Sequence, residues 1–266
     1  MTPTPVTEQA AFVLAPNPGP MTLDGTNSYL LSGPGSASSI VVDPGPDDAG
    51  HLSALATGPV ELILITHRHH DHTEGAAELA RLTGAPVRAA DPAHCIGGAT
   101  LRDGEIITAA GVSVQVIATP GHTTDSVSFL LAGDGPTGSV LTGDTILGRG
   151  TAVIAPPDGS LGSYLDSLRL LAGLGPRFVL PAHGPQLPDL SAVAQEYLAH
   201  REQRLSAIRA VLARLGPRAT VAEVTDAVYT DIDPSVRFAA EHSVAAQLTY
   251  LRGTGGPGPG PGFDGP

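Results

Sequence analysis

Lysine and tryptophan are absent from this sequence of 266 residues, and cysteine occurs only once, at Cys95. A single cysteine excludes an internal disulfide and a structural zinc site built from several thiolates. Apolar runs such as Leu62–Ile65 are far shorter than a bilayer-spanning segment. The N-terminus also lacks the basic segment and apolar stretch of a secretory signal. We therefore expect a soluble, cytoplasmic protein without a membrane partner.

The charge balance is acidic, because 26 aspartates and glutamates outnumber 14 arginines and give a net charge of −12. Affinity for nucleic acid comes largely from neutralising phosphates, so this balance argues against a general polyanion-binding surface. Aromatic residues make up only 4% of the chain, which leaves aliphatic side chains to fill the core. The length predicts one large domain, or one large domain with a small appendage.

A change of pattern near residue 190 divides the chain. Residues 1–190 carry 18 acidic residues and 7 arginines, whereas residues 191–252 carry 7 of each. In the first part, short β-branched runs predict strands at 27–31, 40–43, 61–66, 112–118, 127–132, 139–142 and 178–180. Paired strand runs with few helices between them predict an α+β fold, in which two sheets pack together with helices outside.

Helical patterns are the second local signal. They span 71–82, 160–174, 190–215, 221–229 and 234–251. Because the last three are consecutive, residues 191–252 are expected to form a small, all-helical domain after the main domain of residues 1–190. The stretch 253–266 is nearly all glycine and proline, a composition that predicts a disordered tail.

The residues that carry chemistry are concentrated in segment 67–72, which reads His-Arg-His-His-Asp-His and follows a buried strand pattern. Imidazole and carboxylate are ligands that borderline divalent metals such as zinc prefer. Residues i and i+2 share one side of an extended chain, so His67 and His69 are expected to point the same way. Asp71 and His72 then begin the following helix and can face a second ion. The alternative interpretation is an exposed, histidine-rich turn.

Three further segments each place one metal-type ligand just past a strand pattern. The ligands are His122 after strand 112–118, Asp144 after the run at 140, and His183 after strand 178–180. A nearby glycine in each segment lets the backbone approach closely. Because loops at strand ends often present binding sites on a rigid scaffold, we expect the four segments to converge on one pocket.

This set of ligands resembles the five-part signature of the metallo-β-lactamase superfamily, which implies an αββα sandwich with metals at one edge. Residues 1–190 would be its catalytic domain. Segments 17–20, 25–29, 143–148 and 199–201 are similar to the β-lactamase-like protein two subfamily. That subfamily joins a glyoxalase-II-like domain to a C-terminal winged-helix-like region, here residues 191–252. Glycine and proline repeats stand where the wing is expected, so this region is predicted to be helices only.

The resemblance implies a centre of two zinc ions, with iron or manganese as alternative metals. It assigns His67, His69 and His122 to the first zinc. It assigns Asp71, His72 and His183 to the second zinc, and Asp144 to both as a bridge. Asp71 is the expected catalytic residue, because it can orient the nucleophile and accept its proton while binding metal.

This ligand set predicts hydrolysis of a small ester or thioester by a hydroxide that bridges two zinc ions. The alternative is a metal-dependent endoribonuclease that cleaves single-stranded RNA, although the missing lysine and the acidic charge argue against it. Promiscuous β-lactam hydrolysis and a mono-iron persulfide dioxygenase are lesser alternatives. The expected partner is therefore a small molecule, with RNA as the alternative, and the sequence leaves the oligomeric state open.

Three residues are candidates for substrate contacts. Arg68 occupies a variable position of the motif and either projects toward the substrate or is solvated. Arg149 lies on a loop near the bridging carboxylate, where it can meet an anionic leaving group. Asn27 either lines the site or has a turn or core role. Thr66 and Thr123 are expected to fix the tautomers of histidine ligands through hydrogen bonds.

Overall fold

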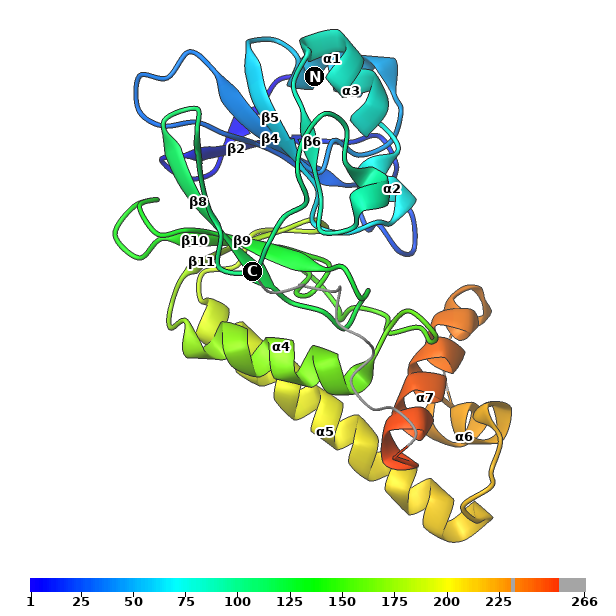
Figure 1. The fold of residues 1–266 in the computed structure, drawn as a ribbon. Coiled ribbons are helices and arrows are strands. Elements are labelled where there is room, and N and C mark those ends of the chain that lie inside the picture. The colour runs from blue at the N-terminus through cyan, green and yellow to red at the C-terminus, as the bar shows by residue number, and fades with distance from the viewer. Residues whose placement is uncertain (231–232, 254–266) are drawn as a thin grey trace.

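The computed structural model describes residues 1–230 and 233–253, and over this range two sheets lie face to face with helices on both outer surfaces (Figure 1). This arrangement confirms the predicted α+β sandwich. Apart from Gly253, the predicted tail 253–266 lies outside the described residues. Among the described residues, no helix is both long enough and apolar enough to cross a membrane.

The first sheet has the strand order β1-β2-β3-β4-β5-β6. Its strands are β1 (Thr4–Pro5), β2 (Ala10–Leu14), β3 (Asn27–Leu31), β4 (Ser39–Val42), β5 (Val60–Leu64) and β6 (Val87–Arg88). Neighbours are antiparallel from β1 to β4 and parallel from β4 to β6. The parallel connections pass through helix α1 (Ala49–Leu55) and then through α2 (His70–Thr73) and α3 (Ala76–Thr83), as parallel strands require a crossover.

The second sheet has the order β11-β10-β9-β8-β7. Its strands are β7 (Ile106–Ala109), β8 (Val112–Ala118), β9 (Val127–Leu131), β10 (Ser139–Gly143) and β11 (Phe178–Pro181). A short 3-10 turn, η1 (Pro92–His94), precedes it. All pairs are antiparallel except β10 and β11, which helix α4 (Leu161–Gly173) connects. Ser160 caps α4, accepting a hydrogen bond from the Ser163 amide.

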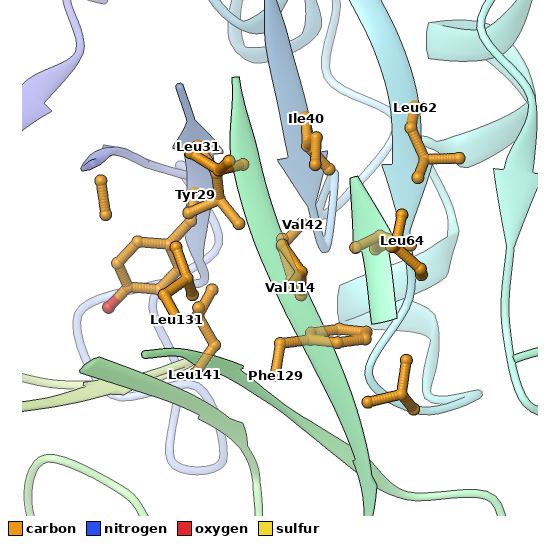
Figure 2. Packing of buried hydrophobic residues seen from close by; sticks show 14 of the residues in the cluster. Tyr29, Leu31, Ile40, Val42, Leu62, Leu64, Val114, Phe129, Leu131 and Leu141 are labelled. Atoms are coloured by element: carbon orange, nitrogen blue, oxygen red, sulfur yellow. The ribbon is translucent and has the colours of Figure 1, made fainter. Parts of the chain in front are cut away.

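The core between the sheets is almost entirely aliphatic. Figure 2 shows Ile40, Val42 and Leu64 of the first sheet facing Val114 and Phe129 of the second sheet, and all five are fully buried. Burying such side chains stabilises the fold by about 1.5–3 kcal/mol each before the entropy cost of folding is subtracted. This dry layer fixes the two sheets together and so fixes the loops at their common edge.

The helices cover the outer faces of both sheets. Leu52 of α1 and Leu79 of α3 pack against Ile63 of the first sheet. Leu168 of α4 packs in one cluster with Val140 of the second sheet, and the first half of α5 (Leu190–Leu215) joins the same cluster. Helix α5 begins at residue 190 and packs on α4 as well as on the helices that follow, so the division into two domains at this point stays a prediction.

The C-terminal region is helical throughout its described part. It continues with α6 (Val221–Val228), the 3-10 turn η2 (Pro234–Val236) and α7 (Arg237–Leu251). Ile208 and Val211 of α5 pack with Val224 of α6 and Val244 of α7, and Figure 1 shows α6 and α7 beside the C-terminal half of α5, away from the two sheets. Among residues 190–230 and 233–253 none lies in a strand, which agrees with the expectation of helices only.

The prediction of one continuous helix over 71–82 is wrong. The chain forms α2 (His70–Thr73), then breaks, then forms α3 (Ala76–Thr83). At the break, the Gly75 amide donates to the Gly45 carbonyl at 2.8 Å. A Cβ atom on Gly75 would lie 2.9 Å from the carbonyl oxygen of Pro46, so only glycine allows this approach. The break docks the junction between α2 and α3 against the loop after β4.

Candidate metal centre

Seven side chains expected to bind metal come together at one edge of the sandwich, where β5, β8, β10 and β11 end. They form overlapping groups whose ligand atoms lie within 4.8 Å of one another: His67, His69 and His122; His67, His72 and Asp144; Asp71, His72 and His183. Backbone hydrogen bonds tie the loops together, since the Val127 amide donates to Thr66 and the Ala182 amide donates to Gly143. The convergence predicted from the strand ends is therefore present.

The first group, which we call the three-histidine cluster, consists of His67, His69 and His122. The Nδ1 atom of His69 lies 3.0 Å from Nε2 of His67 and 3.0 Å from Nε2 of His122. The rings of these pairs meet edge to face, at 79° and 86°. Three imidazole nitrogens thus point at one small volume, which is the arrangement that a tetrahedral cation needs from its protein ligands.

The second group, which we call the aspartate cluster, consists of Asp71, His72 and His183. Oδ2 of Asp71 lies 3.1 Å from Nε2 of His183 and 3.5 Å from Nε2 of His72. Asp144 stands between the clusters. Its Oδ1 lies 3.6 Å from Nε2 of His72, and its Oδ2 lies 3.6 Å from Nε2 of His122. One carboxylate therefore offers an oxygen to each cluster.

Asp43 supports the aspartate cluster and was not found by sequence reasoning. Its Oδ2 lies 2.9 Å from Nδ1 of His72 and accepts a hydrogen bond from the Thr66 hydroxyl at 2.7 Å, while its Oδ1 accepts from the Thr66 amide. Asp43 is buried and has φ +52°, an uncommon backbone conformation for a side chain other than glycine. A carboxylate placed so fixes His72 with Nε2 aimed at the cluster.

His67, His122 and His183 are oriented in the same way by their outer nitrogens. His67 Nδ1 lies 3.1 Å from the Thr66 hydroxyl, as expected for Thr66. His122 Nδ1 donates to the Val153 carbonyl at 2.8 Å, and His183 Nδ1 donates to the Gly25 carbonyl at 3.1 Å. These bonds leave each Nε2 as an unprotonated acceptor for metal in the neutral state. The Thr123 hydroxyl instead hydrogen-bonds with that of Ser126.

The two clusters differ in protonation when no metal is bound. Burial, together with neighbouring histidines, holds the pKa of His67 well below its usual value and lowers that of His69 to about 4. Burial also opposes the charged form of His72 and His183. The carboxylates of Asp71 and Asp43 overcome this effect at His72 and raise its pKa well above the usual value. Asp144 likewise raises the pKa of His183. Conversely, burial alone would raise the pKa of Asp71, but His72 and His183 lower it, so Asp71 is ionised.

The donor set fits divalent cations. Nε2 of His72, Nε2 of His183 and Oδ1 of Asp144 are buried and have no hydrogen-bond partner. Leaving such atoms unpaired costs about 1–3 kcal/mol each, and a cation would satisfy them together. Imidazole nitrogen with carboxylate oxygen suits zinc, iron and manganese among the common metals. The fit rests on these orphaned atoms and does not select one metal.

The three candidate substrate contacts are each held by other partners. Arg68 forms ion pairs with Asp125 and Asp158, at 3.2 and 2.6 Å, and also contacts Thr124. Arg149 is exposed and lies 3.6 Å from Asp24. Asn27 is buried and donates to the carbonyls of 181 and 184, both at 2.9 Å, so it holds the loop that carries His183. Substrate binding by these residues stays a prediction.

The sequence profile of the metallo-beta-lactamase superfamily matches residues 21–183, a range that contains all seven ligands. The chain therefore belongs to this superfamily of metal-dependent hydrolases. Lactamase-like protein adaB of Aspergillus niger is 35% identical over 224 residues, which cover 81% of this chain and 67% of that protein. Lactamase-like protein nscB of Neosartorya fischeri is 37% identical over 212 residues, which cover 76% of this chain and 61% of that protein.

Solved structures agree with this assignment. A metallo-beta-lactamase family protein from Thermus thermophilus superposes with a TM-score of 0.75 and 25% identity, over 95% of this chain and 97% of that chain. The likeness thus extends through the C-terminal helices. The fungal relatives are longer, and this chain spans about two thirds of their length.

Proposed function

We propose that this chain is a binuclear, zinc-dependent hydrolase that acts on a small ester or thioester. The observation that supports two metals is the position of Asp144, which turns one carboxylate oxygen to each cluster. A single-metal enzyme would need only the three-histidine cluster, and the orphaned nitrogens of His72 and His183 would then have no role. We also propose that the chain belongs to the glyoxalase-II-like subfamily, that it divides into two domains at residue 190 and that it is cytoplasmic.

The chain's own residues hold the metals and the reacting groups. His67, His69 and His122 would bind one ion, the aspartate cluster the other, and Asp144 both. When bound, two such ions lower the pKa of a shared water toward about 7 and stabilise negative charge on a carbonyl oxygen. Ester and thioester carbonyls suit this chemistry, because the developing charge is on one oxygen.

Asp71 is the proposed catalytic residue. Its side chain is 28% exposed, whereas those of His72 and His183 are 0% exposed, so it is the aspartate-cluster ligand that a reacting water can reach. Its low pKa keeps it ionised, so it accepts a hydrogen bond from the attacking water and orients it. The same carboxylate can take the proton of that water as the bond to the carbonyl carbon forms.

A small substrate is favoured over RNA by the placement of the arginines. Arg201 on α5 is buried, and Arg209 on the same helix is paired with Glu202 at 2.7 Å. These arginines therefore do not form an open, basic strip for a phosphate backbone. Single-stranded RNA remains the alternative substrate, and β-lactams and persulfides are lesser ones.

The test compares two assays on one zinc-loaded preparation. Hydrolysis of S-lactoylglutathione or p-nitrophenyl acetate should be measurable, and Asp71→Ala should abolish it while the circular dichroism spectrum stays unchanged. Cleavage of a labelled single-stranded RNA that is lost in Asp71→Ala, without ester or thioester hydrolysis, would overturn the proposed substrate class. One equivalent of iron with no zinc in the purified protein would overturn the binuclear zinc proposal.

A further inference from the structure

A second pocket lies behind the metal centre, where the loop after β10 meets helices α5 and α7. Its volume is about 320 Å3. Residues 151–153 form one wall, and Arg201 and Arg204 of α5 form another. None of the seven metal ligands lines it, although the Val153 carbonyl on its wall accepts the hydrogen bond from His122. The pocket is therefore separate from the metal centre but shares a backbone segment with it.

The pocket contains positive charge without a counter-charge. Arg201 is only 3% exposed; its Nη2 donates to the Ala152 carbonyl at 2.5 Å, and its guanidinium lies 5.1 Å from the centre of the Tyr164 ring. Its Nε is buried and has no hydrogen-bond partner. Within residues 1–230 and 233–253, no carboxylate lies within ion-pair distance of Arg201 or Arg204. A buried, unpaired cation is costly in a folded protein, and a bound anion would remove this cost.

His200 lines the same pocket and has a second donor without a partner. Arg204 Nε donates to His200 Nε2 at 3.5 Å, which leaves the proton of a neutral ring on Nδ1. Burial and the two neighbouring arginines lower the pKa of His200, so the ring is neutral at physiological pH. His200 Nδ1 is buried and has no partner. Two donors from adjacent residues of α5 thus lack an acceptor.

The remaining walls are mostly apolar or aromatic. The Arg204 guanidinium lies 4.9 Å from the centre of the Tyr229 ring, and Val236, Ala239, Ala240 and the polar Ser243 complete the surface. A bare inorganic anion would leave these walls solvated. An organic group attached to the anion would cover them, and the volume is at the lower end of the range usual for small-molecule sites.

We propose that this pocket binds a small organic anion, a carboxylate or phosphate monoester attached to an apolar or aromatic group. The anionic group accepts hydrogen bonds from Arg201, His200 and Arg204, and the apolar part packs against Tyr229. The proposal does not depend on ester hydrolysis at the metal centre, because the donors that define it are not metal ligands.

Calorimetric titration of the full-length, zinc-loaded protein with phenylphosphonate tests the proposal. Benzyl alcohol is the uncharged counterpart of this probe. We expect phenylphosphonate to bind, and benzyl alcohol to bind at least about tenfold more weakly, because charge-assisted hydrogen bonds are the stronger kind. Equal binding of the two probes, or no heat from either at millimolar concentration, would overturn the proposal.

Two variants place the binding in this pocket. Arg204→Gln should weaken phenylphosphonate binding by about tenfold or more. Arg209→Gln is the matched control, because Arg209 lies on the same helix but is exposed and paired with Glu202, and it should leave binding unchanged. Arg201→Lys keeps the charge at the buried position and loses the planar fork, so it should also weaken binding. Unchanged binding in Arg204→Gln would mean that the anion sits elsewhere, for example on the metals, and would refute the site.

Enzyme kinetics on the same variants show whether the bound anion is part of the substrate or a separate ligand. If the pocket binds the part of the substrate remote from the scissile bond, phenylphosphonate competes with esters that carry a carboxylate tail. Arg204→Gln then raises KM for those esters alone. If it takes a separate ligand, phenylphosphonate and ester bind together without competition. Both results support the site, and the calorimetric result stands even where no ester is hydrolysed.

Discussion

The two halves of the metal centre are joined by one carboxylate yet differ in the protons they hold. In the three-histidine cluster, the pKa values of His67 and His69 are lowered, so these rings are neutral and ready to bind a cation. In the aspartate cluster, carboxylates raise the pKa values of His72 and His183, so protons occupy the place of a cation. Burial lowers the histidine pKa values in both halves, and the nearby carboxylates determine whether the net shift is downward or upward.

The largest effect is expected from removing the exposed carboxylate of the aspartate cluster. Asp71→Asn should lower kcat by about 100-fold to 10,000-fold, the usual range for loss of a proton-transfer group. Steady-state hydrolysis of p-nitrophenyl acetate measures it. The three-histidine cluster should keep one equivalent of metal, because Asp71 is not one of its ligands.

Glu74→Gln is the matched control for this change. Glu74 is an exposed carboxylate one turn farther along the chain, so its removal should leave kcat unchanged. Loss of activity in both variants would assign the effect to overall charge. Full activity in Asp71→Asn would remove Asp71 from the catalytic role.

Acidification should separate the two halves. A metal that binds the aspartate cluster must displace protons from His72 and His183, whose raised pKa values keep them protonated as the pH falls. Its affinity should fall about tenfold per pH unit for each proton displaced. His67 and His69 resist protonation until the pH approaches about 4, the pKa of His69, so the first ion should stay. Metal analysis after dialysis at pH 7.5 and pH 5.5 should show loss of one equivalent first. Parallel loss of both ions would contradict the difference.

A smaller effect is expected from the buried carboxylate that orients His72. Asp43→Asn should weaken metal binding at the aspartate cluster by about 10-fold to 100-fold, the usual cost of losing such a supporting group. Competition with a zinc chelator measures this affinity. Asp47→Asn, an exposed change four residues on, is the control and should have no effect. An unaltered affinity in Asp43→Asn would show that burial alone holds His72.

The smallest effect is expected outside both clusters. Arg149 is exposed and its contact with Asp24 is long, at 3.6 Å, so Arg149→Gln should change the free energy of unfolding by less than about 1 kcal/mol. Its predicted role in meeting an anionic leaving group would appear as a raised KM for anionic esters only. If Arg149→Gln changes KM equally for anionic and neutral esters, Arg149 does not contact the leaving group.

The convergence of the seven candidate ligands could be predicted because each follows a strand end whose apolar pattern is plain in the sequence. His122 and His183 lie 61 residues apart, but parallel and antiparallel pairing brings both ends to one edge. Residue type then suggested metal binding. The candidate ligands follow four strands, β5, β8, β10 and β11, so the missed strands β1, β2, β6 and β7 did not obscure the site.

Other features depend on contacts that no local pattern records. The role of Asp43 arises from a positive φ and from His72, which is 29 residues distant in sequence. The break at Gly75 arises from its close approach to the loop at Gly45 and Pro46. The pocket at Arg201 exists only because α5 passes beside residues 151–153. Such features follow from tertiary packing, which determines backbone conformation at these points.

Anomalous diffraction at the zinc absorption edge, from crystals grown at pH 7.5 with zinc, tests the central claim most directly. We expect two peaks per chain, one surrounded by the three-histidine cluster and one by the aspartate cluster, with Asp144 touching both. A single peak at the three-histidine cluster, with His72 and His183 still unliganded, would contradict a binuclear centre.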